Sequence, residues 1–290
     1  MEFTLQPHSP FSFQAVVESH GWAQLAPFSK PTDDQLDYLV ELPDRSVARL
    51  NFSAAPAGLQ VTTPDALSSA QLKQVQDYAA WMFGLELDLE GFYRRAREEP
   101  KLAHVPQEAR GRVLRSATVF EDVVKTILTT NVQWGGTKRM ATGLVAAFGA
   151  PHPDEPQQRA FPTPPRLAEL TQAQMDEKVR LGYRTPYVLQ LAQEVTGGQR
   201  DLEALKHSDL PSDELRRELL AIKGVGSYAA ANLLMLLGRH DAIPIDSWAR
   251  KMVSQEFYDG QPVTTAQIEA VFENWGAYRG LAFWFWNWSQ

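Results

Sequence analysis

The sequence contains no cysteine among its 290 residues. This absence excludes disulfides, thiolate nucleophiles, cysteine zinc sites and iron–sulfur clusters held by cysteine. The six histidines are scattered, with no pair at the i, i+4 spacing of a helix, so nothing in the pattern supports a histidine metal site. Enzymes that depend on a reactive thiol or on a cysteine-held cluster are therefore excluded.

Long apolar runs are also missing, since none approaches the ~20 residues that a membrane helix needs. The first ten residues lack the basic and apolar stretches of a secretory signal. With 44% hydrophobic and 22% charged residues, the composition is that of an ordinary globular protein of one large domain or two smaller ones. We expect an intracellular protein with no membrane partner.

Basic residues are scarce at the N-terminal end. Residues 1–90 carry 12 Asp and Glu against 4 Lys and Arg, and residues 91–290 carry 23 against 24, so the net charge of −7 arises in the first third. A basic stretch follows between Phe92 and Met140, which can face phosphates or form a solvated charged surface. Its basic residues are Arg94, Arg95, Arg97, Lys101, Arg110, Arg112, Arg115, Lys125, Lys138 and Arg139.

The apolar pattern changes its period along the chain. Alternation typical of strands marks residues 36–42, 47–52 and 59–63, which predicts a small antiparallel sheet. From about Ser68 the period becomes 3.6, which predicts helices to the C-terminus; one spans residues 120–128 with Ser116 as its N-cap. The predicted fold class is α+β, with an N-terminal antiparallel sheet domain packed on a mainly helical core.

The most informative stretch predicts a helix-hairpin-helix near residues 213–238. One helix ends in Leu219, Leu220 and Ile222, a turn reads Gly224-Val225-Gly226, and Ser227 opens a second helix. Glycines in such a turn let backbone N–H groups at a helix start approach a phosphate closely, and the helix dipole favours the anion.

The same glycines also match a looser dinucleotide-binding fingerprint, in which a strand precedes the turn. Here the preceding segment, DELRRELLAIK, is charged at helical spacing and has no β-branched run. This context disfavours the nucleotide fold. A simple helix-helix turn without function is the remaining alternative.

A carboxylate follows the hairpin at a short distance, because Gly238, a polar loop and Pro244 lead to Asp246 in AIPIDSWARK. Here the chain resembles the helix-hairpin-helix, Gly/Pro-rich loop, aspartate superfamily of DNA glycosylases, nearest the AlkA-type 3-methyladenine and 8-oxoguanine branch. The segments ILTTN at 127–131 and LGYRTPYV at 181–188 are similar to those that hold opened DNA in this family, and WGAYRGLAFWFWNW at 275–288 is similar to its closing helix. The resemblance covers nearly the whole chain.

The resemblance implies a catalytic role for Asp246. Cleavage of an N-glycosidic bond builds positive charge on the sugar, and a fixed carboxylate stabilises this charge or activates water. As an alternative, Asp246 caps the helix that starts at Ser247, and one side chain can do both. Family members that also cut the strand carry a lysine two residues after the second hairpin glycine, where this chain has Tyr228. A glycosylase without lyase activity is therefore implied.

The resemblance also implies which residues contact DNA. Gly224, Val225, Gly226 and Ser227 are expected to bind a phosphate, while Asn131 and Tyr183 hold the opened duplex and Arg184 lies near the unpaired base. No cofactor is required and no iron–sulfur cluster is expected. A structural Na⁺ or K⁺ at the hairpin is implied, held by the backbone carbonyls of Leu220, Ile222 and Val225.

A pocket for the flipped base needs aromatic faces and a few polar groups. The candidates are Tyr228, Phe283, Asn287 and Trp288, with Trp286 as a further aromatic; Phe283 and Asn287 are expected one helical turn apart. An aromatic stripe at helical spacing is also typical of a buried core, so a core role is the competing interpretation.

These observations predict a sheet domain over residues 1–100 and a helical glycosylase core over residues 101–290. The expected function is hydrolytic removal of an alkylated purine such as 3-methyladenine from damaged double-stranded DNA, by a monomer in the bacterial cytoplasm or a eukaryotic nucleus. An 8-oxoguanine glycosylase and a non-catalytic DNA-binding protein are the alternatives. An acidic residue at position 246 favours the enzymes.

Overall fold

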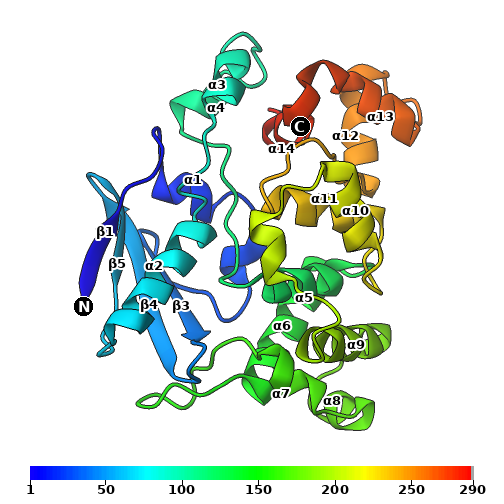
Figure 1. The fold of residues 1–290 in the computed structure, drawn as a ribbon. Coiled ribbons are helices and arrows are strands. Elements are labelled where there is room, and N and C mark those ends of the chain that lie inside the picture. Colours follow the sequence, from blue (N-terminus) through cyan, green and yellow to red (C-terminus); the bar gives the residue numbers. More distant parts are fainter. Residues whose placement is uncertain (289–290) are drawn as a thin grey trace. The chain divides into compact units, whose positions relative to one another are not determined.

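The computed structural model describes residues 1–288, which form two compact units (Figure 1). Unit 1 consists of residues 1–87 and 112–208, and unit 2 of residues 88–111 together with the chain from Asp209 onward. Each unit is therefore built from two segments, so the units cut across the predicted division at residue 100. Among the described residues, no helix is long and apolar enough to cross a membrane.

Unit 1 contains a five-stranded antiparallel sheet in the order β1-β5-β4-β3-β2. The predicted strands are present, and in the register Leu36 pairs with Phe52 and Phe52 with Val61, which places these buried residues on one face. The predicted α+β class is confirmed. The strands are β1 (Glu2–Leu5), β2 (Ser29–Thr32), β3 (Gln35–Glu41), β4 (Val47–Ala55) and β5 (Gly58–Thr62).

Helices of unit 1 pack on the buried face of this sheet. The ring of Phe83, at the end of α2, lies 5.0 Å from Phe52 on β4 and 5.7 Å from Phe13 on α1. Tyr38 of β3 donates its hydroxyl to Glu121 of α5 at 2.5 Å. The helices are α1 (Phe13–Val17), α2 (Ser69–Met82), α5 (Val119–Thr129), α6 (Trp134–Phe148), α7 (Pro164–Ala168), α8 (Gln172–Lys178) and α9 (Thr185–Thr196), with 3-10 helices at Gly21–Gln24 (η1), Gly182–Arg184 (η2) and Glu203–His207 (η3).

The predicted Ser116 cap of α5 is wrong, because Thr118 is the N-cap and its hydroxyl accepts the N–H of Glu121. Ser116 is instead buried, and its N–H donates to Asp122 while its hydroxyl accepts from Lys125. Side chains of α5 itself therefore satisfy Ser116, which lies two residues before the N-cap.

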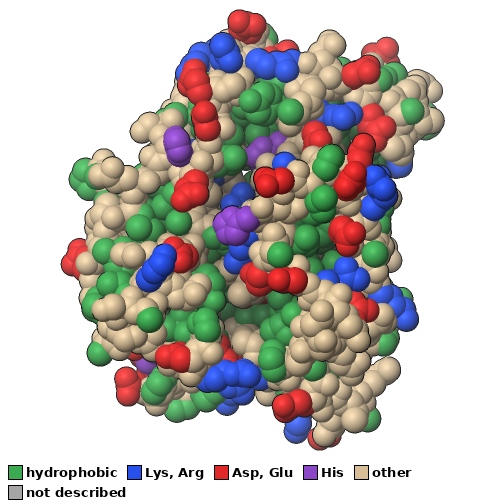
Figure 2. All heavy atoms as spheres, in the orientation of Figure 1, with side chains coloured by type: hydrophobic (Ala, Val, Ile, Leu, Met, Phe, Trp, Pro, Cys, Tyr) green, Lys and Arg blue, Asp and Glu red, His purple; other side chains and the backbone are tan. Residues whose placement is uncertain are grey.

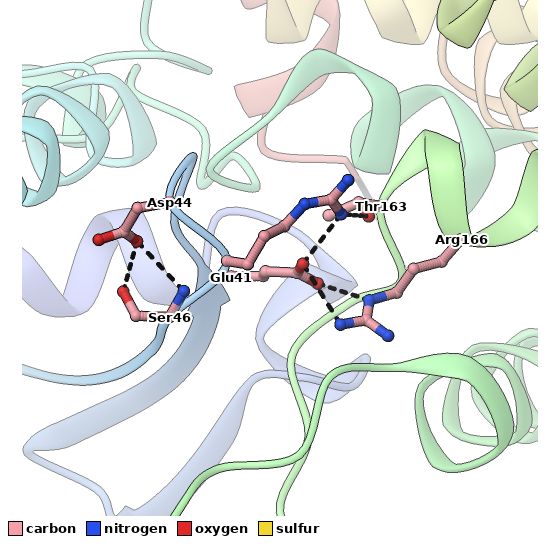
Figure 3. A network of polar contacts seen from close by, with 6 residues as sticks. Glu41, Asp44, Ser46, Thr163 and Arg166 are labelled. Atoms are coloured by element: carbon pink, nitrogen blue, oxygen red, sulfur yellow. Dashed lines mark hydrogen bonds and ion pairs between the residues drawn. The ribbon is translucent and has the colours of Figure 1, made fainter.

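The turn between β3 and β4 is held by polar side chains (Figure 3). Glu41, whose side chain is 1% exposed, accepts from Arg166 of α7 at 2.8 Å and from Arg45 at 3.2 Å. Asp44 accepts the N–H and the hydroxyl of Ser46 at 3.1 and 2.6 Å. Two guanidinium groups thus compensate the buried Glu41 charge, which ties α7 to the sheet.

Unit 2 is helical. Its helices are α3 (Glu90–Ala96), α4 (His104–Gln107), α10 (Ser212–Leu220), α11 (Ser227–Leu236), α12 (Ser247–Phe257), α13 (Thr265–Val271) and α14 (Arg279–Phe285), with a 3-10 helix at Glu273–Tyr278 (η4). The early segment joins the rest through Lys101, which forms an ion pair with Glu256 at 2.5 Å, and through Arg95, which donates to the carbonyl of Trp275 at 3.0 Å. Two distant parts of the chain therefore share one core.

Candidate active site and nucleic-acid interface

Helices α10 and α11 form the predicted helix-hairpin-helix in unit 2. Gly224 has a φ of +93°, a conformation that L side chains rarely adopt, and the Val225 N–H donates to the Ile222 carbonyl at 3.0 Å to close the turn. Gly226 is the N-cap of α11 in an extended conformation. The two glycines therefore differ in their roles. The positive φ at position 224 favours glycine in the turn, whereas other residues can adopt the extended backbone at position 226.

The start of α11 is open for an anion. No side chain caps this end, and Gly226 and Ser227 are exposed. A Cβ added to Gly226 would meet no atom within 4 Å. The first N–H groups of α11 and its dipole can therefore bind a phosphate without any side-chain cation.

Asp246 is the N-cap of α12. Its Oδ1 accepts the N–H of Ala249 at 2.8 Å, and the residue is half-buried. The capping role that the sequence offered as an alternative for Asp246 is therefore present in the structure. Since the cap uses one carboxylate oxygen, the negative charge remains available for a second task.

Tyr228 lies in the first turn of α11, where the charge of Asp246 affects the pKa of its phenol. Burial raises the pKa of the Tyr228 phenol above its usual range, and the negative charge of Asp246 raises this pKa further. The phenol is therefore neutral at physiological pH. It provides a hydrogen-bond donor and an aromatic face within the electrostatic influence of the carboxylate, but no amine.

Aromatic side chains of unit 2 form a continuous cluster. Phe283 is 3% exposed, and its ring lies 5.4 Å from Trp288 and 5.7 Å from Phe272. The expected one-turn spacing of Phe283 and Asn287 is wrong, because α14 ends at Phe285. Asn287 instead lies after the end of α14, outside any helix or strand, where its backbone N–H donates to the Lys101 carbonyl at 3.0 Å.

Trp248 is a site candidate that the sequence analysis missed. It follows Asp246 by two residues in the first turn of α12 and is 49% exposed. Its ring stands edge-on to Phe283 at 6.2 Å and to Trp288 at 5.9 Å. An aromatic residue within the motif AIPIDSW was the available signal, but only the packing shows that it extends the cluster towards Asp246.

The predicted duplex-holding residues come together in unit 1. Asn131 follows α5 with a φ of +47°, and its Nδ2 donates to the Tyr183 hydroxyl at 3.3 Å. The Tyr183 hydroxyl also donates to the carbonyl of Thr130 at 3.2 Å, and Tyr183 is 47% exposed. Two segments 52 residues apart thus present one exposed aromatic ring with an amide beside it.

Arg184 differs from its partner Tyr183, because its side chain is buried and bound by the protein. It donates to the carbonyls of Leu181 and Thr130. This placement argues against the predicted contact of Arg184 with an unpaired base.

The basic stretch between Phe92 and Met140 does not form a continuous phosphate-facing surface. Arg112 is buried and donates to the carbonyls of residues 8, 10, 84 and 87, and Lys125 is buried against Glu121 at 2.6 Å. Arg115 is likewise buried and donates to the carbonyl of Trp81. On the face in Figure 2, basic and acidic side chains are interspersed within each unit.

A monovalent ion at the hairpin stays a prediction. Among residues 1–288, no group of three or more His, Cys, Asp or Glu side chains is placed to hold a metal. Of the predicted carbonyl ligands, that of Ile222 already accepts the Val225 N–H and has one lone pair left. Leu220 ends α10 and Val225 lies in the turn, and their carbonyl oxygens are hard donors of the kind that bind cations of this class.

No protein-family model matches the chain, and no curated protein sequence matches it. Solved structures do match it. A 3-methyladenine DNA glycosylase from Archaeoglobus fulgidus is 18% identical with a TM-score of 0.77, covering 98% of this chain and 97% of its own. The structure of MBOgg1 with a low-affinity DNA ligand is 21% identical with a TM-score of 0.71, covering 95% and 90%.

A third structure, the 8-oxoguanine glycosylase/lyase of Clostridium acetobutylicum, is 18% identical with a TM-score of 0.67, covering 90% of this chain and 98% of its own. At these identities the comparisons show the fold. The chain has the fold of the helix-hairpin-helix DNA glycosylases along almost its whole length, as the sequence resemblance implied.

Proposed function

We propose that the protein is a DNA glycosylase of base excision repair that hydrolyses the bond between a damaged base and its sugar, without cutting the strand. Asp246 carries the proposal: it is a half-buried carboxylate held at the N-cap of α12, one helix after the open hairpin turn, and its charge acts on the neutral phenol of Tyr228. Two fold neighbours of the chain are named as glycosylases, and two neighbours were solved with DNA. We infer that duplex DNA is the partner and that a monomer acts on it.

In the proposed mechanism Asp246 acts on the sugar. As the bond to the base lengthens, positive charge develops on the deoxyribose, and the fixed carboxylate stabilises it or orients the attacking water. The cap hydrogen bond from Ala249 holds this carboxylate, so little reorganisation is needed during the reaction. Departure of the base needs no covalent intermediate with the protein, which agrees with a tyrosine at position 228.

Alkylated purines such as 3-methyladenine are the proposed substrates. A cationic or weakly bonded base needs mainly an aromatic face, and Trp248 with Phe283 and Trp288 provides one near Asp246. The second candidate, 8-oxoguanine, is favoured by fold neighbours of that activity at similar TM-scores.

The test is a panel of substrates incubated with the wild-type chain and with Asp246→Asn. Methylated genomic DNA is analysed for released purines, and duplexes with a single 8-oxoguanine, hypoxanthine or uracil are treated with alkali to reveal abasic sites. Release of methylated purines by the wild type alone supports the proposal. Release of 8-oxoguanine alone supports the second candidate, and tight binding without release from any substrate would show a non-catalytic protein.

A further inference from the structure

Arg184 lies at the junction of η2 and α9, with its cation enclosed by unit 1. The side chain is 6% exposed. Its guanidinium donates to the Leu181 carbonyl at 3.3 Å and to the Thr130 carbonyl, and lies 4.0 Å from the sulfur of Met140. The planar fork thus connects the end of α5 to the start of α9.

The same guanidinium lies against Tyr183. Its Cζ atom is 4.4 Å from the centre of the Tyr183 ring, which fits a cation–π contact. The Tyr183 hydroxyl donates to the Thr130 carbonyl at 3.2 Å and also lies 3.1 Å from the Thr130 hydroxyl. Arg184 and Tyr183 therefore converge on one carbonyl oxygen, and the ring is fixed at its face and at its hydroxyl.

Asn131 is held by the same contacts around the Thr130 carbonyl. Its backbone is in the left-handed region directly after Thr130, and its amide donates to the Tyr183 hydroxyl at 3.3 Å. A shift of the Thr130 carbonyl would therefore move both exposed side chains. A side chain that must enter an opened duplex gains from being held in place beforehand, because less freedom is lost on binding.

We propose that Arg184 is a positioning residue that holds Tyr183 and Asn131 ready to enter the duplex, and that it does not read the base opposite the lesion. This inference rests on the proposed function. Because the guanidinium is buried and its two terminal nitrogens donate to the protein carbonyls of Leu181 and Thr130, its effect on base flipping is the same whichever base is opposite.

The test uses Arg184→Lys, which keeps the charge but loses the planar fork and the stacking face. The exposed Arg180, four residues earlier, gives the matched control Arg180→Lys. Flipping is followed with a fluorescent base analogue, and excision of the preferred lesion is measured opposite each of the four bases. We expect Arg184→Lys to lower flipping and excision about ten-fold, by the same factor opposite all four bases, while binding to undamaged duplex and the control variant stay unchanged.

A second variant keeps the inference testable if Arg184→Lys folds poorly, as judged by its melting temperature. Tyr183→Phe removes the hydroxyl contacts but keeps the ring, and we expect a similar loss of flipping with unchanged stability. In the double variant the losses should be less than additive, because both act through the Thr130 carbonyl.

Loss opposite one base only would show that Arg184 reads that base, and normal flipping in both variants would make it purely structural. Either result overturns the inference while leaving the proposed function intact. If the wild-type chain excises no base, the proposed function fails first, and the inference falls with it.

Discussion

At the scale of single residues, Asp246 caps α12 and, in the proposed mechanism, acts on the sugar, and one substitution can separate these two tasks. Asn keeps the shape and the oxygen that accepts the Ala249 N–H, so the cap is retained within about 0.5 kcal/mol. The charge is lost, and at ~4 Å and an effective dielectric near 20 a unit charge pair is worth about 4 kcal/mol. We therefore expect Asp246→Asn to slow base release roughly a thousand-fold in single-turnover assays, with little change in affinity for lesion DNA.

The control separates a lost cap from a lost charge. Thr264 caps α13 through the same type of hydrogen bond to Gln267. Thr264→Ala should lower the free energy of unfolding by about 1 kcal/mol and leave base release unchanged. Normal turnover by Asp246→Asn would assign the reaction to another group.

Tyr228 leads to a second prediction at this scale. A lyase needs an amine that attacks C1′ and can be trapped with borohydride as a covalent adduct. Tyr228 has a phenol with a raised pKa, so it stays protonated and offers no such amine. We expect the wild-type chain to leave an intact abasic strand and no trapped complex on denaturing gels.

The counterpart is Tyr228→Lys, which introduces an amine at the start of α11. A borohydride adduct in this variant, and in no other, would show that the position can reach C1′. A trapped adduct with the wild-type chain would contradict the prediction, and Lys223, just before the turn, would be the first lysine to replace.

Residue types in a local motif could be predicted far better than their environments. The carboxylate at position 246 follows from its place after the hairpin, because a helix cap and the proposed reaction both call for a carboxylate there. Trp248 was missed, since a single exposed aromatic carries no periodic signal. The burial of Arg184 could not be predicted either. Its guanidinium binds the Thr130 carbonyl, which is 54 residues away in the chain.

At the scale of elements, the hairpin turn between α10 and α11 gives a prediction about DNA binding. Gly226 is extended, and a methyl group there would meet no protein atom within 4 Å, so Gly226→Ala should fold normally. The methyl group would instead stand where a phosphate approaches the N–H groups. We expect affinity for damaged and undamaged duplexes to fall by the same factor, about ten-fold, in fluorescence anisotropy titrations.

Gly224→Ala provides the contrast. At a φ of +93° an L residue is strained, so this variant should lose about 1 kcal/mol of stability before any effect on DNA binding. A loss of affinity confined to lesion DNA in Gly226→Ala would place the turn near the base pocket and not at a phosphate.

Whether a strand or helix can be predicted from the sequence depends on which of its residues are buried. Strands β4 and β5 alternate buried with partly exposed positions, as does β3 in its first four residues, so their period reveals them. All four residues of β2 are exposed, one of them a proline, so this edge strand has no apolar pattern. The C-terminal aromatic run predicted a longer helix, whereas α14 ends at Phe285 and the backbone of Asn287 forms hydrogen bonds with the carbonyl and the ammonium group of Lys101.

At the scale of the whole molecule, the stability of the fold depends on ionisable groups enclosed in unit 1. Trp22 lies between two of them: its ring is 4.7 Å from that of His20, and its Nε1 donates to Asp122 at 2.7 Å. Burial lowers the pKa of His20 to about 4, opposed by a hydrogen bond with the Leu114 carbonyl. Burial also raises the pKa of Asp122 to about 6, against the effect of the Ser116 and Trp22 hydrogen bonds.

The two shifts act on stability with opposite signs. The raised pKa of Asp122 means that its stabilising contribution is complete below pH 3.8 and is lost as the pH rises through about 6. The lowered pKa of His20 means that stability is lost as the pH falls from 6.5 towards 4, because the unfolded chain takes up the proton first. Each shift corresponds to about 3 kcal/mol at most, so the two largely cancel in the wild-type chain.

Replacing either Asp122 or His20 should reveal the pH dependence of stability that the other side chain causes. In Asp122→Asn the Oδ1 acceptor for Trp22 and Ser116 is kept, so we expect the free energy of unfolding to rise from pH 4 to 6.5 by up to about 3 kcal/mol. In His20→Gln it should fall by a similar amount between pH 4 and 7. Urea unfolding at pH 4.5, 5.5, 6.5 and 7.5 measures both slopes, with the exposed Asp77→Asn as control. If both variants keep the wild-type pH profile, these side chains titrate in the folded protein as they do in the unfolded chain, and their burial stores no pH-dependent free energy.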